Sequence, residues 1–167
     1  MIVLKRVLVA TDFSGPSDAA LTYGRALART YGASLSLLHV AANQFLQSTA
    51  ADPVTLAAAH IRWLDNDLTA ADRDELRGRA VVETSDSPAR AIVDYARREA
   101  IDLIVMGTQG RSTMSQILVG SVAERVVRTA PCPVLTVRQP EHEFVVPDES
   151  DQEEESHDSP QEHLSRH

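Results

Sequence analysis

The sequence has one cysteine, no long apolar run and no export signal, and each absence narrows what the protein can be. Cys132 has no second cysteine to pair with, so an intramolecular disulfide is excluded. No apolar run approaches the ~20 residues that span a bilayer, and the apolar stretch at residues 1–4 is too short for a signal peptide. These absences predict a soluble protein of the cytoplasm that does not enter a membrane.

Basic residues are also outnumbered, with 16 lysines and arginines against 24 acidic residues, and the imbalance is local. Residues 139–167 hold ten of the acidic residues and one arginine, a net charge of −9, whereas residues 1–138 carry +1. A nearly neutral domain with an acidic extension offers no basic surface to a phosphate backbone. Nucleic-acid binding is therefore not expected.

The same change in composition divides the chain into two parts. Residues 1–138 have the length of one domain with a core of ordinary size. Residues 139–167 contain one aromatic residue, Phe144, and too little apolar surface to offset the entropy of ordering. We expect a folded domain at 1–138 and an acidic, disordered tail at 139–167. The tail could bind a partner, aid solubility or compete for the cationic side of a binding site.

What the first 138 residues do contain is a regular alternation of apolar runs and amphipathic segments. Five short apolar runs are typical of strands buried on both faces, at residues 6–11, 34–40, 79–84, 102–106 and 133–137. Segments with helix-start residues separate most of them, with the boundaries inside 43–78 the least defined. Strands that alternate with helices predict parallel pairing and an α/β three-layer sandwich with a doubly wound sheet.

Helix signals are clearest around two prolines. Ser14 and Pro16 begin a segment that Gly32 closes, with inward-facing positions expected to extend as far as Tyr31. Ser87 and Pro88 begin another, and its inward-facing residues are expected to be Ile92, Val93, Ala96 and Ala100. A further helix is expected after Asp52-Pro53, and the last one from about Ser121 to Thr129.

A glycine-containing loop follows the fourth strand and carries the chemistry. Gly107, Gly110 and Gly120 follow the spacing G-x2-G-x9-G, and Ser121 comes next. Glycines let backbone N–H groups approach a phosphate, and the start of a helix favours an anion. Arg111 and nearby hydroxyls would add charge and hydrogen bonds. Taken singly, each glycine could equally be a turn residue, but together at the end of a central parallel strand they favour phosphate binding.

This loop resembles the nucleotide-binding motif of the ATP-binding branch of the universal stress protein family. The resemblance extends over residues 3–138 and includes residues 9–14, 37–40, 102–107, 121–126 and 130–135. It implies a Rossmann-like fold of the adenine nucleotide alpha hydrolase type, with sheet order 3-2-1-4-5. The acidic tail has no counterpart in the common family pattern.

The resemblance also implies a set of residues around bound ATP, with Mg²⁺ possible at the phosphates. Asp12 and Val40 would meet the adenine and ribose, and Ala10 and Thr11 would line the pocket. The residues along the ribose and phosphates would be Met106, Gly107, Thr108, Gly110, Arg111, Gly120, Ser121 and Val122. An independent argument agrees, because ligands of parallel sheets bind beyond the carboxyl ends of the strands.

Three residues admit a second interpretation. Asp12 could be a turn or helix-capping residue instead of a nucleotide contact. His39 could be a base or a ligand, but no carboxylate or second histidine is near it in sequence, which favours a packed structural histidine. Cys132, between two prolines, is interpreted as a small buried hydrophobe because no histidine pattern supports a nucleophile.

Several nucleotide enzymes are excluded by what their sites require. The chain has no GxxxxGK[ST] loop, which excludes P-loop motors and GTPases, and no DxDxT start after the first strand, which argues against haloacid-dehalogenase phosphotransferases. It lacks the paired acids of a phosphoacceptor receiver domain. It also lacks the His-x-Gly-His and Ser-Gly-Gly loops of adenylate-forming proteins. No clustered ligands suggest a transition metal. We therefore expect a regulatory ATP-binding protein that is not an enzyme. The alternatives are a slow ATPase or autophosphorylating protein, and a nucleotide-free interaction module with an unidentified protein partner.

The fifth strand predicts how the protein assembles. In the order implied by the resemblance it lies at a sheet edge, and Val134, Leu135, Thr136 and Val137 carry no charge. An uncharged edge strand readily pairs with another strand. We expect a homodimer formed through antiparallel pairing of this strand.

Overall fold

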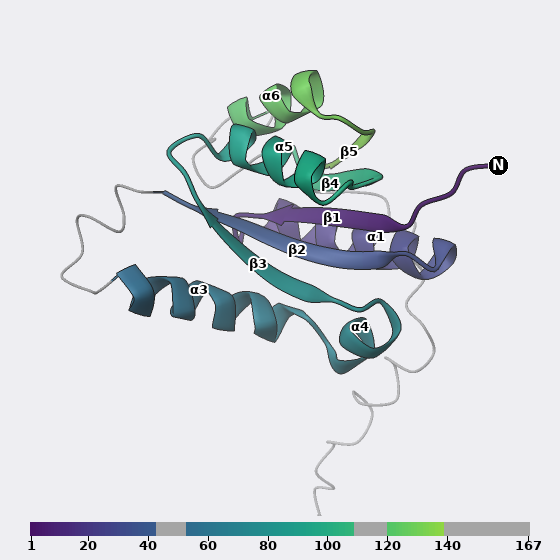
Figure 1. Ribbon diagram of the computed structural model, residues 1–167, viewed down its shortest axis with the longest axis horizontal. Helices are drawn as coiled ribbons and strands as arrows, with labels where there is room; N and C mark the ends of the chain where they lie inside the picture. Colours follow the sequence, from purple (N-terminus) through teal and green to yellow (C-terminus); the bar gives the residue numbers. More distant parts are fainter. Residues whose placement is uncertain (43–52, 109–119, 139–167) are drawn as a thin grey trace, which may run out of the picture.

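The computed structural model describes residues 1–42, 53–108 and 120–138 (Figure 1). The predicted tail at 139–167 lies outside the described residues. The elements in chain order are β1 (Arg6–Thr11), α1 (Gly15–Tyr31), β2 (Ser34–Ala41), α3 (Pro53–Asp67), α4 (Ala70–Glu75), β3 (Arg79–Thr84), α5 (Pro88–Arg98), β4 (Leu103–Gly107), α6 (Ser121–Thr129) and β5 (Val134–Val137). Among these helices, none is long and apolar enough to cross a membrane.

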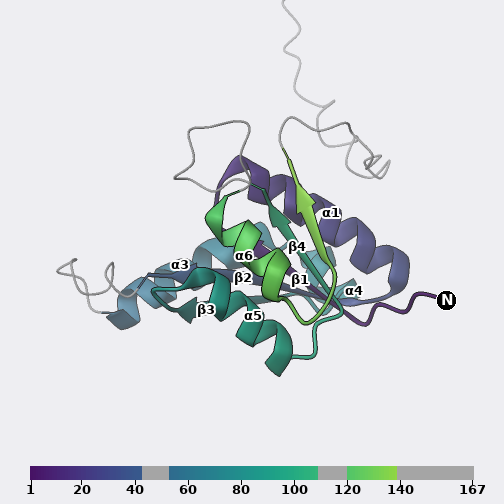
Figure 2. The same cartoon turned by 90° about the horizontal axis from the view of Figure 1, so that it is seen from above.

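The strands form one parallel five-stranded sheet in the order β3-β2-β1-β4-β5, as predicted. Helices α1, α3 and α4 lie on one face of the sheet and α5 and α6 on the other (Figures 1 and 2). The three-layer α/β sandwich is therefore confirmed. Its order reverses beside β1, which places the crevice between the carboxyl ends of β1 and β4 at the topological switch point.

Strand β1 shows why the apolar runs are continuous. Val7, Leu8 and Val9 are each 0% exposed. Val7 and Val9 pack in the layer of α1, whereas Leu8 and Ala10 pack in the layer of α5 and α6. A strand covered on both faces needs an apolar residue at every position, so the period-two pattern of a half-exposed strand disappears.

Helix α1 begins and ends where the sequence predicted. Ser14 precedes it, and the Ser14 N–H donates to Ser17 Oγ at 3.0 Å. Gly32 ends it with φ 62°, a left-handed conformation that suits glycine. Gly24 allows the helix to lie close to β1, because a Cβ there would be 2.3 Å from Val9 Cγ2. This close packing sets the distance between the middle of α1 and β1.

Three details differ from the sequence prediction. Tyr31, the last residue of α1, is 41% exposed instead of inward-facing. Ala100 lies beyond the end of α5, with φ 48°, and is exposed. Ile101 takes the buried place, and its N–H donates to the carbonyl of Ala96 at 2.9 Å. At Ala100 helical spacing was extended past the residue where the backbone leaves the helix, whereas Tyr31 lies within α1 with its side chain exposed in the last turn.

The segment 43–78 contains a second helix that the sequence analysis did not separate. Helix α4 begins with a capping box, in which the Asp72 N–H donates to Thr69 Oγ1 at 3.1 Å and the Thr69 N–H donates to Asp72 Oδ2 at 3.0 Å. The spacing Thr69-x-x-Asp72 is a visible, though short, start signal. Asp72 is fully buried and bonds to Arg25 on α1, so α4 is fixed by tertiary contacts.

Candidate functional site

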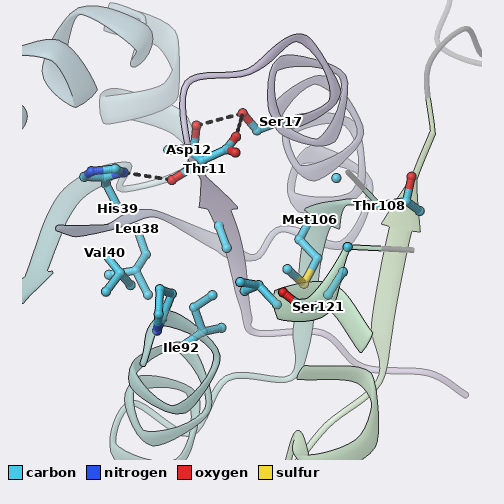
Figure 3. Close-up of a pocket in the computed structure, with 16 residues that line it drawn as sticks. Thr11, Asp12, Ser17, Leu38, His39, Val40, Ile92, Met106, Thr108 and Ser121 are labelled. Carbon is cyan, nitrogen blue, oxygen red and sulfur yellow. Dashed lines mark hydrogen bonds between the residues drawn. The ribbon is translucent and has the colours of Figure 1, made fainter. Parts of the chain in front are cut away.

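A cavity of about 310 Å³ opens beyond the carboxyl ends of β1, β2 and β4 (Figure 3). This volume lies at the lower end of the range for small-molecule sites. Helices α5 and α6 contribute the other walls. The position agrees with the rule for parallel sheets that the sequence analysis applied.

The structure brings ten of the twelve predicted site residues together around this cavity. They are Ala10, Thr11, Asp12, Val40, Met106, Gly107, Thr108, Gly120, Ser121 and Val122. Gly110 and Arg111 lie outside the described residues. The structure therefore shows that the predicted residues share one cavity, and their roles toward a ligand stay predictions.

One side of the cavity is apolar. Ala10 and Met106 come from adjacent central strands, paired in register, and Leu38 and Val40 come from β2. Ile92 of α5 completes this wall (Figure 3). An apolar wall of this kind accepts the flat face of a heterocyclic base.

The turn between β1 and α1 forms a polar side. Ser14 Oγ donates to Asp12 Oδ1 at 2.5 Å, and the Ser14 N–H donates to the same oxygen at 3.2 Å. Thr11 Oγ1 donates to Ser17 Oγ at 3.0 Å, and Ser17 Oγ also donates to Asp12 Oδ1 at 3.2 Å (Figure 3). Asp12 is thus a turn residue that also lines the cavity, and its contact with a nucleotide stays a prediction. Its carboxylate is oriented by hydroxyl donors, as suits an acceptor for ribose hydroxyls.

The two ends of the glycine-containing loop meet at a third side of the cavity. The Gly120 N–H donates to the carbonyl of Thr108 at 2.6 Å, and the Thr108 N–H donates to the carbonyl of Val137 at 2.8 Å. Gly120 is the N-cap of α6, and Ser121 is its exposed first residue. The first N–H groups of a helix have no partner within the helix, and its dipole end is positive. This side of the cavity is suited to an anion.

Gly107 has a packing role at the same place. A Cβ on Gly107 would lie 2.9 Å from Pro16 Cβ and 3.0 Å from the Pro16 carbonyl carbon. The end of β4 and the start of α1 therefore touch through this glycine. Close packing against helix α1 therefore accounts for a glycine at this position, and the approach of its N–H group to a phosphate stays a prediction.

Six cavity residues were not predicted. They are Ser17, Leu38, His39, Pro88, Ile92 and Ala123. Leu38 shares a strand face with Val40 two residues later, and Ile92 shares a helix face with Pro88 four residues earlier. The spacing of two along a strand could have identified Leu38 from the predicted residue Val40. The spacing of four along a helix could have identified Ile92 if Pro88 had been predicted. Which face of α5 meets the cavity, however, depends on how that helix packs on the sheet.

His39 and Cys132 follow their structural interpretations in part. His39 packs against Phe13 with ring centroids 4.6 Å apart, but it also borders the cavity. Cys132 is half-buried beside the α5 and α6 layer, and this burial raises the pKa of its thiol. A raised thiol pKa disfavours the nucleophilic thiolate. Across the three described ranges, no group of three His, Cys, Asp or Glu residues could hold a metal ion.

Comparison with known proteins places this fold and cavity in a family. The family model described as the universal stress protein family matches residues 4–138. The chain belongs to the universal stress protein family. The match covers the whole of the domain expected from composition and leaves out the acidic tail.

Individual members of the family agree with this assignment. A universal stress protein of Thermus aquaticus is 32% identical over 139 residues, covering 81% of this chain and 100% of that protein. One from Methanocaldococcus jannaschii is 54% identical over 56 residues, covering 34% of this chain and 33% of that protein. The crystal structure of a universal stress protein in complex with cAMP has a TM-score of 0.60 and 28% identity, covering 82% of this chain and 99% of that one.

Proposed function

We propose that this protein binds an adenine nucleotide, ATP in particular, and that the bound nucleotide regulates a homodimer. The observation that carries the proposal is that one cavity combines an apolar wall with the start of α6. The apolar wall suits the base, the hydroxyl-bound Asp12 suits the ribose, and the helix start suits the phosphates, with Mg²⁺ accompanying them.

The comparisons support the nucleotide class. The universal stress protein crystallised with cAMP has the same fold at 28% identity, and cAMP carries an adenine, a ribose and a phosphate. Those three parts correspond in chemistry to the three sides of the cavity. ATP is preferred here because Gly110 and Arg111 of the predicted loop would add contacts for further phosphates.

We propose a regulatory and not an enzymatic role. Fast hydrolysis needs a positioned base, and Asp12 is the carboxylate of the described residues that lines the cavity. Two serine hydroxyls donate to this carboxylate, so it is already engaged in the hydrogen bonds of the β1–α1 turn. The regulatory output would be a change in the partner affinity or the conformation of the dimer.

The first experiment identifies the nucleotide. The protein is purified without added nucleotide and denatured, and the released compounds are identified; the stripped protein is then titrated with ATP and Mg²⁺ beside a Gly110→Val variant. We expect a released adenine nucleotide, or micromolar binding that the variant loses. Conversion of ATP to ADP faster than about one per second would favour an enzyme. Absence of any nucleotide and of binding would favour the interaction module.

The dimer is expected to form through β5. The carbonyls of Pro133 and Val137 accept N–H groups from the β4 side, at Ile104 and Thr108. Backbone groups alternate in direction along a strand, so those of Val134 and Thr136 face the open edge. Among the described residues no further strand pairs with this uncharged edge, so we propose that it pairs with a second copy.

Light scattering at micromolar concentration tests this assembly. We expect the mass of a dimer for the unaltered chain and the mass of a monomer for Thr136→Pro, which removes an outward N–H without removing a β4–β5 hydrogen bond. Circular dichroism checks that the variant stays folded. A monomeric mass for the unaltered chain would overturn the proposed interface.

A further inference from the structure

Four rings from three separate parts of the chain meet beside the cavity. Phe13 lies in the turn after β1, His39 lies near the end of β2, and His60 and Trp63 lie one turn apart on α3. The ring centroids are 4.6 Å apart for Phe13 and His39, 5.9 Å for Phe13 and Trp63, 4.9 Å for His39 and His60, and 5.3 Å for His60 and Trp63. We call these four residues the ring cluster.

Two residues of the ring cluster bond to the cavity residue Thr11, one at its carbonyl oxygen and one at its side-chain hydroxyl. His39 Nδ1 lies 3.0 Å from the carbonyl oxygen of Thr11, and the Phe13 N–H donates to Thr11 Oγ1 at 3.0 Å. A carbonyl only accepts, so His39 carries its proton on Nδ1 in this contact. Figure 3 shows the contact of His39 with Thr11, through which the position of Thr11 is linked to the ring cluster.

Phe13 has a backbone conformation that a phenylalanine does not adopt without support. Its φ is 61°, in the left-handed region, where a residue with a Cβ is disfavoured by about 1–2 kcal/mol. Contacts of its ring with His39 and Trp63 are available to offset this strain. Strained turns at binding sites persist only when their surroundings hold them. Here the surroundings include α3, an element that does not itself line the cavity.

His60 is the ring of the cluster that least tolerates a charge. It is 9% exposed, its Nδ1 has no hydrogen-bond partner, and its burial lowers its pKa from 6.5. A proton on His60 would place a largely buried cation 4.9 Å from the ring of a second histidine. In the part of the chain that the structure describes, no hydrogen-bond acceptor meets Nδ1 to compensate for that charge.

The charged groups around His60 come from each element packed against α3. On β2 the group is His39. In the β1–α1 turn it is Asp12, whose carboxylate accepts hydrogen bonds from two serine hydroxyls. The α3-facing side of β3 carries Ala80 and Val82, whereas Glu83 pairs with Arg98 of α5. On α1, Asp18 and Arg25 act on Asp67 at the far end of α3. Arg62 and Asp65 are exposed on α3 itself.

We infer that the ring cluster is a pH-sensitive positioning element for the proposed nucleotide site. Helix α3 holds Phe13, and through it Thr11 and Asp12, in the binding geometry, and a proton on His60 releases that hold. The inference rests on the proposed function and adds regulation to it. Phe13, His60 and Trp63 are positioning residues, because none of them lines the cavity.

The direction of the pH effect follows from linkage. In the closed state, in which the four rings are in contact, burial lowers the pKa of His60. In the released state, in which α3 no longer holds Phe13, the pKa of His60 returns toward 6.5. The released state therefore binds more protons as the pH falls below about 6.5, and the closed state loses population relative to it. Nucleotide affinity should be full above this pH and fall below it.

Titration of ATP at a series of pH values tests the inference. Between about pH 7.5 and about pH 5.5, we expect the Kd of the unaltered chain to rise at least about five-fold more than that of His60→Phe. The ratio of the two proteins cancels the titration of ATP itself. His60→Gln is a second neutral variant in case the phenylalanine does not fit. Parallel profiles for all three proteins would overturn the inference alone, whereas no ATP binding at about pH 8 would overturn the proposed function as well.

Two variants on α3, one inside the ring cluster and one outside it, test at constant pH whether the cluster positions Thr11 and Asp12. Trp63 is 55% exposed and belongs to the cluster, whereas Ile61 is 41% exposed on the same helix and takes part in none of the ring contacts. We expect Trp63→Ala to weaken ATP binding several-fold with its melting temperature little changed, and Ile61→Ala to leave both unchanged. Trp63 is the single tryptophan, so its emission should also change when ATP binds to the unaltered chain. Equal affinities of the two variants would contradict the role of the cluster.

Discussion

Replacing Ser121 with glutamate is expected to weaken ATP binding at least about tenfold without weakening the fold. Ser121 is exposed, lies at the first position of α6 and lines the cavity. A carboxylate there would face the phosphates, and each pair of like unit charges about 5 Å apart costs about 1–3 kcal/mol. The same carboxylate stabilises the helix by about 0.3–1 kcal/mol, because it lies at the positive end of the dipole. Binding and stability should therefore change in opposite directions.

Two controls make this result specific to phosphate. Ser121→Gln has nearly the same size without the charge and should bind ATP close to normally. Adenosine has no phosphate, so its affinity should be the same for Ser121→Glu and the unaltered chain. Isothermal titration gives the affinities, and thermal unfolding gives the stability. An equal loss for ATP and adenosine would show that the glutamate distorts the cavity and that phosphates do not lie at the start of α6.

Replacing Asp72 with asparagine is expected to lower the free energy of unfolding by about 3 kcal/mol. The Asp72 side chain is 0% exposed, and its Oδ2 lies 2.8 Å from Arg25 Nε. The same oxygen accepts the Thr69 N–H at 3.0 Å, and Oδ1 lies 3.8 Å from Arg29 Nη2. Asparagine keeps the shape but removes the charge that Arg25, which is 22% exposed, pairs with at 2.8 Å. Because Arg25 retains some solvent, the loss should lie at the low end of that for a broken buried ion pair.

The matched control is Glu75→Gln on the same helix. Glu75 is 62% exposed and its oxygen lies 3.7 Å from Arg29 Nε. An exposed ion pair of this kind contributes about 0–1 kcal/mol, so the control should be close to neutral. Urea unfolding with a constant m-value measures both changes. If the two variants lose the same small amount, Asp72 does not fix α4 to α1.

The sequence predicted strand bounds and helix starts best, because each of these depends on a few neighbouring residues. The buried strands are continuous apolar runs, and their predicted ends agree with the structure within one residue. Ser14 with Pro16 and Ser87 with Pro88 correctly marked the starts of α1 and α5. The end of α5 was less well predicted at Ala100, because helical spacing gives no sign of where the backbone leaves the helix.

The same distinction holds for the site: residues placed by local sequence could be predicted, and residues placed by helix packing could not. Residues at the strand ends could be predicted because parallel strands bring their carboxyl ends to one edge, and the family resemblance selected among them. Pro88 and Ile92 were missed because their place depends on how α5 packs over the sheet. The capping box of α4 is short, and its Asp72 is held by arginines of a distant helix that no local pattern identifies.

By itself, the sequence determined the α/β class, the order of strands and helices, and a glycine-containing loop beside a parallel sheet. These follow from hydrophobic patterns and start signals that act between neighbours in the chain. Only the tertiary structure decided that Phe13, His39, His60 and Trp63 meet and that their rings reach the backbone of Thr11. The physical reason is that burial and ring contact depend on residues far apart in the chain, whose positions are set by the packing of whole helices on the sheet.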